Sequence, residues 1–166
     1  MDIEASGFGR HSYPIEVGFV LPDGRSYCTL IRPAPSWTHW DPKAEGVHHI
    51  AWSVAAQHGR DVAEVAQHLN NELWGMTLYC DGWAHDYVWL NVLYEEAGMT
   101  PSFKLEHVRA LLSDPQAARW ATIKERVSAE MNLQRHRAST DARVLQRTLS
   151  LLGAAQPLHP AVRATG

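Results

Sequence analysis

Two neighbouring segments rich in β-branched and aromatic residues constrain the fold of this chain more than any other feature. They are residues 13–20 and 26–31, and the composition of both favours strands. The five residues between them, Leu-Pro-Asp-Gly-Arg, carry strong turn chemistry. The sequence therefore predicts a β-hairpin close to the N-terminus.

Shorter apolar runs and longer helical patterns account for most of the remaining chain. Strands are predicted at residues 1–5 and 76–80. Helices are predicted at residues 61–73, 86–97, 116–131 and 140–152. Because strands come first and helices dominate later, we expect an α/β fold in which helices cover a mixed sheet.

The length of 166 residues and the hydrophobic content of 45% suit a single compact domain. We expect this domain at residues 1–152 and a loosely ordered tail at residues 153–166, where small residues and prolines show no clear period. No apolar run is long enough to cross a membrane, and acidic residues stand where a secretory signal would be basic. A cytoplasmic protein without a membrane segment is expected.

Cysteine content and charge exclude few functions. Cys28 and Cys80 each lie inside a predicted strand without CxxC spacing, and both are expected to be reduced core residues. The net charge of -3 does not by itself indicate nucleic-acid binding. Between Arg119 and Arg147, however, there are seven basic and three acidic side chains, which indicates either a local basic face or an ordinary solvated helix surface.

The first residues of the chain, Asp2-Ile3-Glu4, carry two carboxylates on the same face of a predicted strand, because side chains alternate along a strand. Two acids on one face repel each other unless a cation lies between them. The alternative is a solvated strand edge, but the apolar surroundings favour a metal site.

A second group of polar residues lies near the C-terminus and reads His-Arg-Ala-Ser-Thr-Asp over residues 136–141. The histidine belongs to a polar loop, and the aspartate falls in the first turn of a predicted helix. This spacing lets Asp141 bind a metal ion while His136 reaches a water molecule bound to the same ion.

Together these segments resemble the three exonuclease motifs of the DEDDh superfamily, which includes ribonuclease T, oligoribonuclease and the proofreading exonucleases. The matching segments are residues 2–7, residues 86–90 and the HxAxxD run at residues 136–141. The resemblance covers about residues 1–152 and implies a ribonuclease H-like fold, with a mixed five-stranded sheet flanked by helices. It also implies 3′-to-5′ hydrolysis of phosphodiester bonds from the 3′ end of single-stranded RNA or DNA.

The resemblance assigns a role to each residue of these motifs. Asp2, Glu4, Asp86 and Asp141 would hold two Mg²⁺ or Mn²⁺ ions, and two-metal hydrolysis does require several carboxylates at one point. His136 would act as the general base, because an imidazole can be unprotonated near neutral pH.

The same resemblance places the substrate. Ser6, Gly7 and Phe8 follow the first motif directly and would hold the terminal 3′-OH and wedge the last bases of the strand. Family members often form dimers, so the resemblance also allows a homodimer.

The second motif contains two aspartates. Asp86 is the expected metal ligand, whereas Asp81 is expected to lie outside the site. His48 and His49 are similar to a short HxI segment that shapes the substrate groove in the family, although either could simply pack in a loop. His85 departs from the family, which generally has an aromatic or apolar residue before the metal-binding aspartate.

Tryptophans offer stacking surfaces for bases, but most are expected to pack in the core. Trp89 and Trp120 occupy apolar helical positions and are expected to be buried. Trp37, Trp40 and Trp83 have loop-like or polar surroundings and could approach a substrate.

Two other functions deserve comparison. A catalytically inactive exonuclease-like module could bind nucleic acid without cleaving it, because a fold alone does not determine function. The complete set of four acids and one histidine argues against it. A structural zinc protein could use His39, His48, His49 and His85, but the sequence lacks cysteine pairs and regular histidine spacing.

Overall fold

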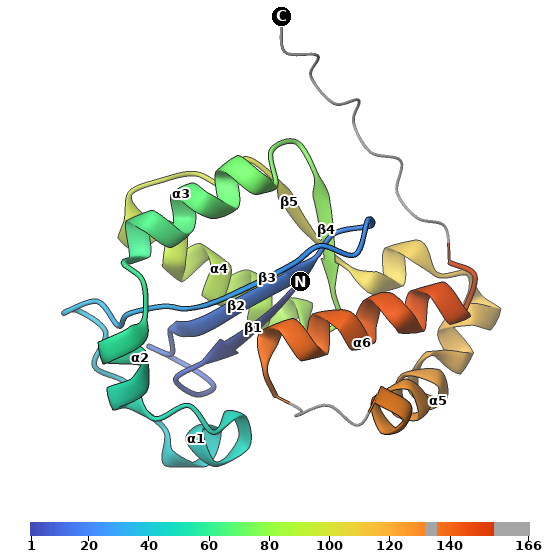
Figure 1. Cartoon of the computed structure of the whole chain (residues 1–166), viewed down its shortest axis with the longest axis horizontal. Helices are drawn as coiled ribbons and strands as arrows, with labels where there is room; N and C mark the ends of the chain where they lie inside the picture. Colours follow the sequence, from blue (N-terminus) through green and yellow to red (C-terminus); the bar gives the residue numbers. More distant parts are fainter. Residues whose placement is uncertain (132–135, 155–166) are drawn as a thin grey trace, which may run out of the picture.

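The computed structural model describes residues 1–131 and 136–154, so residues 155–166 of the expected tail lie outside the described residues. Three strands open the chain, and helices make up most of the structure after them (Figure 1). The five strands are β1 (Asp2–Ala5), β2 (Pro14–Val20), β3 (Ser26–Leu30), β4 (Thr77–Cys80) and β5 (Lys104–His107).

Strands β1, β2 and β3 form an antiparallel sheet with β2 in the middle, and β4 and β5 form a separate parallel pair. The predicted hairpin is therefore confirmed, and the fold is mixed α/β, but the single five-stranded sheet is wrong. In the described part of the chain, one hydrogen bond joins the residue before β1 to β4, from the Met1 amino group to the Tyr79 carbonyl oxygen at 2.9 Å. A ladder needs a series of such bonds.

Strand β5 is absent from the sequence-based prediction for a clear reason. Of its four residues only Leu105 is buried, and the others are charged or polar and exposed. Such a segment has neither the apolar run nor the alternation that indicates a strand. It becomes a strand because β4 offers it a parallel pairing edge.

The helices are α1 (Pro42–His48), α2 (Trp52–His58), α3 (Val62–Glu72), α4 (Trp83–Ala97), α5 (Asp114–Met131) and α6 (Ala138–Leu151), with a short 3₁₀ helix at Val108–Leu111. The four predicted helices are confirmed as α3 to α6. Helix α4 begins one turn earlier than expected, which places Asp86 in its first turn.

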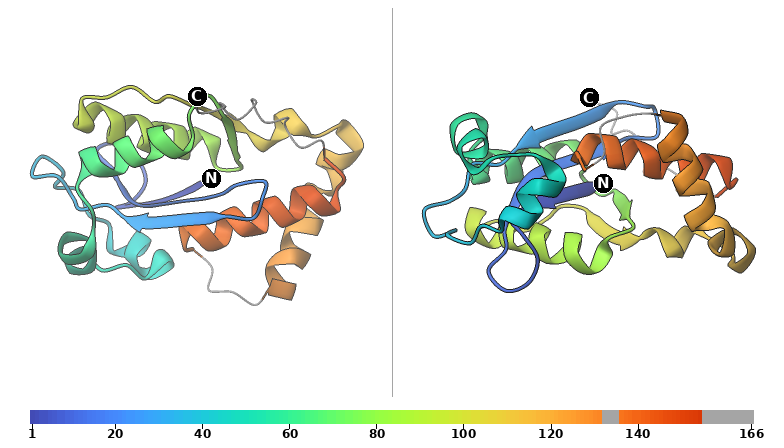
Figure 2. Two further views of the ribbon diagram at one scale, coloured as in Figure 1. Left: turned by 45° about the horizontal axis from the view of Figure 1, so that its top comes forward. Right: turned by 90° about the horizontal axis from the view of Figure 1, so that it is seen from below.

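The three-stranded sheet has one apolar and one polar face. Ile3, Val17 and Phe19 point into the main hydrophobic core, which α3 and α4 complete. Glu4 pairs with Glu16 across β1 and β2, and alternation puts both on the opposite face, where α6 packs (Figure 2). The first motif thus presents its carboxylates to α6.

Gly18 allows α6 to come this close. A Cβ atom on Gly18 would lie 2.5 Å from the backbone nitrogen of Ser139 and 2.6 Å from the carbonyl carbon of Ala138. A side chain at position 18 would therefore push the first turn of α6 away from the sheet.

Two expectations about exposure can also be compared with the structure. None of the helices in the described residues is long and apolar enough to span a membrane. Cys80 is buried as expected, but Cys28 is exposed, so its expected place in the core is wrong. It lies on β3, at the edge of the sheet, where side chains are not covered on both faces.

Candidate active site

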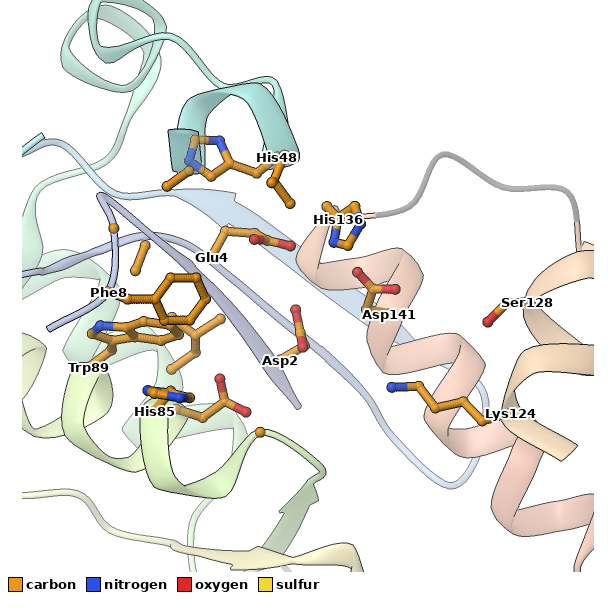
Figure 3. A pocket seen from close by; sticks show the side chains of 17 residues that line it. Asp2, Glu4, Phe8, His48, His85, Trp89, Lys124, Ser128, His136 and Asp141 are labelled. Carbon is orange, nitrogen blue, oxygen red and sulfur yellow. The ribbon is translucent and has the colours of Figure 1, made fainter. Parts of the chain in front are cut away.

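A pocket of about 290 Å³ lies where β1, α4 and α6 come together, at the lower end of the range for ligand pockets (Figure 3). Its lining includes Asp2 and Glu4 from β1, Asp86 from α4 and Asp141 from α6. The structure therefore gathers all four acids of the expected metal site, although three separate segments of the sequence supply them.

His136 lines the same pocket and immediately precedes the first residues of α6. Ligand atoms of Glu4, His136 and Asp141 all lie within 4.8 Å of one another. At that separation, an imidazole nitrogen and two carboxylate oxygens can share a cation or a water molecule. The backbone of His136 has a φ of 58°, a conformation that is uncommon outside glycine and that turns the chain into the helix.

Burial and mutual repulsion raise the pKa values of the acids. Burial, followed by the charges of Asp86, Glu4 and Asp141, raises the pKa of Asp2 well above its ordinary value. Burial and then the charge of Asp141 raise the pKa of Glu4 to about 8. Burial also raises the pKa of Asp86 to about 6. Without a cation, this site retains protons at pH values where exposed carboxyl groups are ionised.

The donor set fits divalent metal ions. Oxygen ligands from several carboxylates are what Mg²⁺ and Mn²⁺ prefer. Atom Oδ2 of Asp86 is buried and has no hydrogen-bond partner among the described residues. Because an unsatisfied buried polar atom is costly, a cation at this position would remove that cost and neutralise the clustered charge.

The raised pKa of Glu4 predicts how pH and metal ions change the stability of the protein. Between pH 4.5, the ordinary pKa of this group, and about pH 8, the folded state holds a proton that the unfolded state has lost. The free energy of unfolding without metal should therefore fall as the pH rises through this range. Mg²⁺ or Mn²⁺ should restore it, because a cation replaces the proton.

Thermal denaturation at pH 6 and pH 8, in EDTA and in saturating metal, measures this effect. We expect metal to raise Tm by ~5 °C or more at pH 8 and by less at pH 6. The variant Glu4→Gln should show a weaker dependence of the metal-free Tm on pH. Equal metal-induced shifts at the two pH values would contradict this prediction.

Of the three residues expected to bind substrate, two line the pocket and one does not. Gly7 and Phe8 line the pocket, but Ser6 is not among the lining residues. Ser6 is buried, and its hydroxyl oxygen accepts a hydrogen bond from the Tyr13 backbone N–H at 3.1 Å and lies 3.2 Å from Nδ1 of His39. Its side chain stabilises the loop after β1.

An aromatic wall made of Phe8, His85 and Trp89 forms one side of the pocket (Figure 3). The ring of Phe8 is 65% exposed and lies 5.1 Å from His85 and 5.8 Å from Trp89, measured between centroids. His85 stacks on Trp89 at 5.6 Å. Trp89 is buried as expected, but it also lines the pocket. It follows Asp86 on α4 by three residues, a spacing that places both on the same face of the helix and could have indicated its role.

The remaining expected tryptophans have structural partners and do not line the pocket. Trp37 stacks on Tyr13 at 5.0 Å, and Trp83 donates from Nε1 to the Leu105 carbonyl oxygen at 3.0 Å. Trp40 donates from Nε1 to a carboxylate of α1 at 2.7 Å. Trp120 is half-buried and packs against a cluster formed by α5 and α6.

The histidines of the zinc hypothesis do not gather. Among the described residues, the one group with three ligand atoms within 4.8 Å of one another consists of Glu4, His136 and Asp141, and it contains none of these four histidines, so the zinc hypothesis is wrong. His48 lines the pocket instead, whereas His49 is exposed at the end of α1. Nδ1 of His48 accepts from a backbone N–H at 3.0 Å, while its Nε2 is buried without a hydrogen-bond partner in the described part of the chain.

An ion pair between a buried carboxylate and a partly exposed arginine anchors the start of α6. Glu16 on β2 is 1% exposed and accepts from Arg137 Nε at 3.1 Å and Nη2 at 2.5 Å, and from the Ala138 backbone N–H at 2.8 Å. Arg137 directly follows His136 and precedes Asp141 by one helical turn. The pair therefore determines where both of these residues lie relative to β1, and motif spacing gives no sign of it.

Three of the described basic side chains between Arg119 and Arg147 are paired with a carboxylate, whereas Arg119 and Arg147 are exposed. Arg126 pairs with Glu130, and Arg143 donates to Ser26 at 2.8 Å. Arg135 lies outside the described residues. Two further basic residues form ion pairs with acids that are distant in the sequence: Lys124 pairs with Asp81, and Arg137 pairs with Glu16.

Lys124 and Ser128 on α5 were not expected in the pocket, yet both line it. Their spacing of four residues puts them on one face of the helix, and this spacing is the sequence feature that could have indicated a shared site. Asp81 is outside the lining, as expected, and it holds the Lys124 ammonium group in an ion pair.

No family model matches the sequence, and no curated protein matches it either. Solved structures do share the fold. Exonuclease I from Escherichia coli, in complex with a 5cy-dT13 oligonucleotide, matches with a TM-score of 0.69 and 11% identity. The match covers 91% of this chain and 39% of the exonuclease I chain. Exonuclease I from the moderately thermophilic Methylocaldum szegediense matches with a TM-score of 0.61 and 13% identity, over 90% of this chain and 39% of the exonuclease I chain.

These neighbours are exonucleases, which is the kind of relative that the sequence motifs indicate. The chain spans about two fifths of the exonuclease I chains that it matches. Over nearly its whole described length, this chain therefore has a fold that is shared with a segment of exonuclease I.

Proposed function

We propose that this chain is a 3′-to-5′ exonuclease that uses two Mg²⁺ or Mn²⁺ ions to hydrolyse single-stranded RNA or DNA from the 3′ end. The observation that carries this proposal is the convergence of Asp2, Glu4, Asp86 and Asp141 with His136 in one pocket. So many acids at one place are costly without cations, because burial and repulsion both oppose their ionised forms. The exonucleases that share the fold support the proposal.

When bound, the two cations would polarise the phosphodiester and stabilise the charge on the leaving oxygen. The four carboxylates would hold them, and His136 would accept the proton of the attacking water. The water oxygen bonds to phosphorus as the bond from phosphorus to the 3′ oxygen of the preceding nucleotide breaks. That oxygen takes up a proton, and a nucleoside 5′-monophosphate leaves.

The walls of the pocket support an unpaired strand end as the substrate. A base that stacks on the exposed ring of Phe8 would gain about 1 to 3 kcal/mol whatever its identity. Such stacking requires a base that is free of its complement. The homodimer that the sequence resemblance allows stays a prediction, as does a cytoplasmic location.

Degradation of matched oligonucleotides tests the proposal. Single-stranded RNA and DNA, labelled at either the 3′ or the 5′ end, are incubated with Mg²⁺ or Mn²⁺ and with EDTA. We expect the 3′ label to be released first as a mononucleotide, the 5′ label to remain on a shrinking ladder, and EDTA to stop both. Binding without cleavage at any metal concentration would instead indicate an inactive nucleic-acid-binding module.

A further inference from the structure

The wall of the pocket opposite Phe8 and Trp89 is formed by α5. Figure 3 shows Lys124 and Ser128 on this helix, with Asp2 and Asp141 between the two walls. The aromatic wall can take a base, but it contains no lysine or arginine to hold a phosphate. A bound strand must still bring its negatively charged backbone past the acidic centre of the pocket.

Lys124 is the one lysine or arginine among the described residues that line the pocket. Its side chain is 32% exposed and pairs with Asp81, which is 21% exposed. Partly exposed ion pairs contribute little net stability, so exchanging one anionic partner for another costs little. Ser128 lies one helical turn further along and can donate its hydroxyl to the same anion, as serines do at phosphates.

The position of Asp81 also matters. It lies outside the pocket lining, so its carboxylate is not part of the group that would hold cations, yet it neutralises Lys124 from the side. In this arrangement Asp81 does for Lys124 what a phosphate oxygen would do: it supplies a negatively charged acceptor at the edge of the pocket.

We propose that Lys124 and Ser128 form a binding site for a backbone phosphate of the substrate strand, and that Asp81 occupies Lys124 until the phosphate displaces it. This inference rests on the proposed function and deepens it, since it locates the strand's backbone on α5 and its bases on the aromatic wall. Lys124 binds the strand, and Asp81 competes with the strand for Lys124.

Competition predicts effects of opposite sign for the two partners. Lys124→Ala removes a phosphate contact, so KM should rise by about 10-fold and the salt dependence of log KM should become shallower by about 0.7 to 1. Asp81→Asn frees Lys124, so KM should fall by about 2-fold to 5-fold. In the Lys124→Ala background, Asp81→Asn should have no further effect, because no ammonium group remains to be released.

The test measures kcat and KM on a single-stranded oligonucleotide with Mg²⁺ at several salt concentrations, for these three variants and for Ser128→Ala. Arg126→Ala is the matched control, because Arg126 lies on the same helix, pairs with Glu130 and does not line the pocket. Its KM and salt dependence should match those of the unmodified protein. Lys124→Gln, which keeps most of the side chain, serves if the alanine variant lowers Tm.

Three results would overturn the inference. If the Lys124 variants leave the salt dependence of KM unchanged, Lys124 does not contact a phosphate. If KM rises for both Asp81→Asn and Lys124→Ala, the ion pair supports the shape of the pocket and Asp81 does not compete with the strand. A fall in KM for Asp81→Asn that persists in the Lys124→Ala background would be a general charge effect. If the unmodified protein degrades the strand in all these cases, the proposed function stands and only the phosphate site fails; without binding or degradation by that protein, both fail.

Discussion

Replacing His136 with alanine is expected to lower kcat by roughly 10²-fold to 10⁴-fold, the usual contribution of a positioned general base. The imidazole lies within 4.8 Å of ligand atoms on Glu4 and Asp141, so it can reach a water molecule in the pocket. The affinity for Mg²⁺ or Mn²⁺ should change little, because the four carboxylates supply the charge that holds the ions.

Asp141→Asn is the informative comparison for this prediction. A neutral amide is a poorer ligand for a hard cation, so this variant should weaken metal binding as well as slow hydrolysis. Isothermal titration with Mn²⁺ and steady-state kinetics measure the two quantities separately. A His136→Ala protein with full activity at neutral pH would remove histidine from the mechanism, and with it the DEDDh assignment.

The second large effect is expected at Glu16. Glu16→Ala would leave the partly exposed Arg137 and the buried Ala138 backbone N–H without their acceptor, and a buried donor left unsatisfied typically costs about 1 to 3 kcal/mol. We expect Tm to fall by ~5 °C. Activity measured well below that Tm should fall too, because the start of α6 positions both His136 and Asp141.

Variants of an exposed ion pair show whether the burial of Glu16 causes the expected loss of stability. Asp23 forms an ion pair with Arg25 in which the side chains are 52% and 70% exposed, so Asp23→Ala should change Tm by little. The double variant Glu16→Ala/Arg137→Met should recover part of the stability, because it removes the guanidinium that has lost its partner. Similar losses of Tm for Glu16→Ala and Asp23→Ala would show that the pair of Glu16 and Arg137 does not anchor α6.

Much of the architecture can be predicted from the sequence because it is encoded locally. The composition of residues 13–20 and 26–31, and the turn between them, predict a hairpin that the structure confirms. Helical periodicity predicts α3 to α6 to within a few residues. Alternation along residues 1–5 puts Asp2 and Glu4 on one face, and both line the same pocket. Each of these signals depends on residues within one turn or one strand.

Tertiary packing decided what depends on partners distant in the sequence. Only the Met1 amino group, just before β1, bonds to β4 in the described residues, so the expected five-stranded sheet is divided into two. β5 is a strand because β4 pairs with it. The contacts of Glu16 with Arg137, and of Lys124 with Asp81, bring together residues that no local pattern relates. Periodicity states which face a side chain takes, but only the packed chain determines what lies opposite that face.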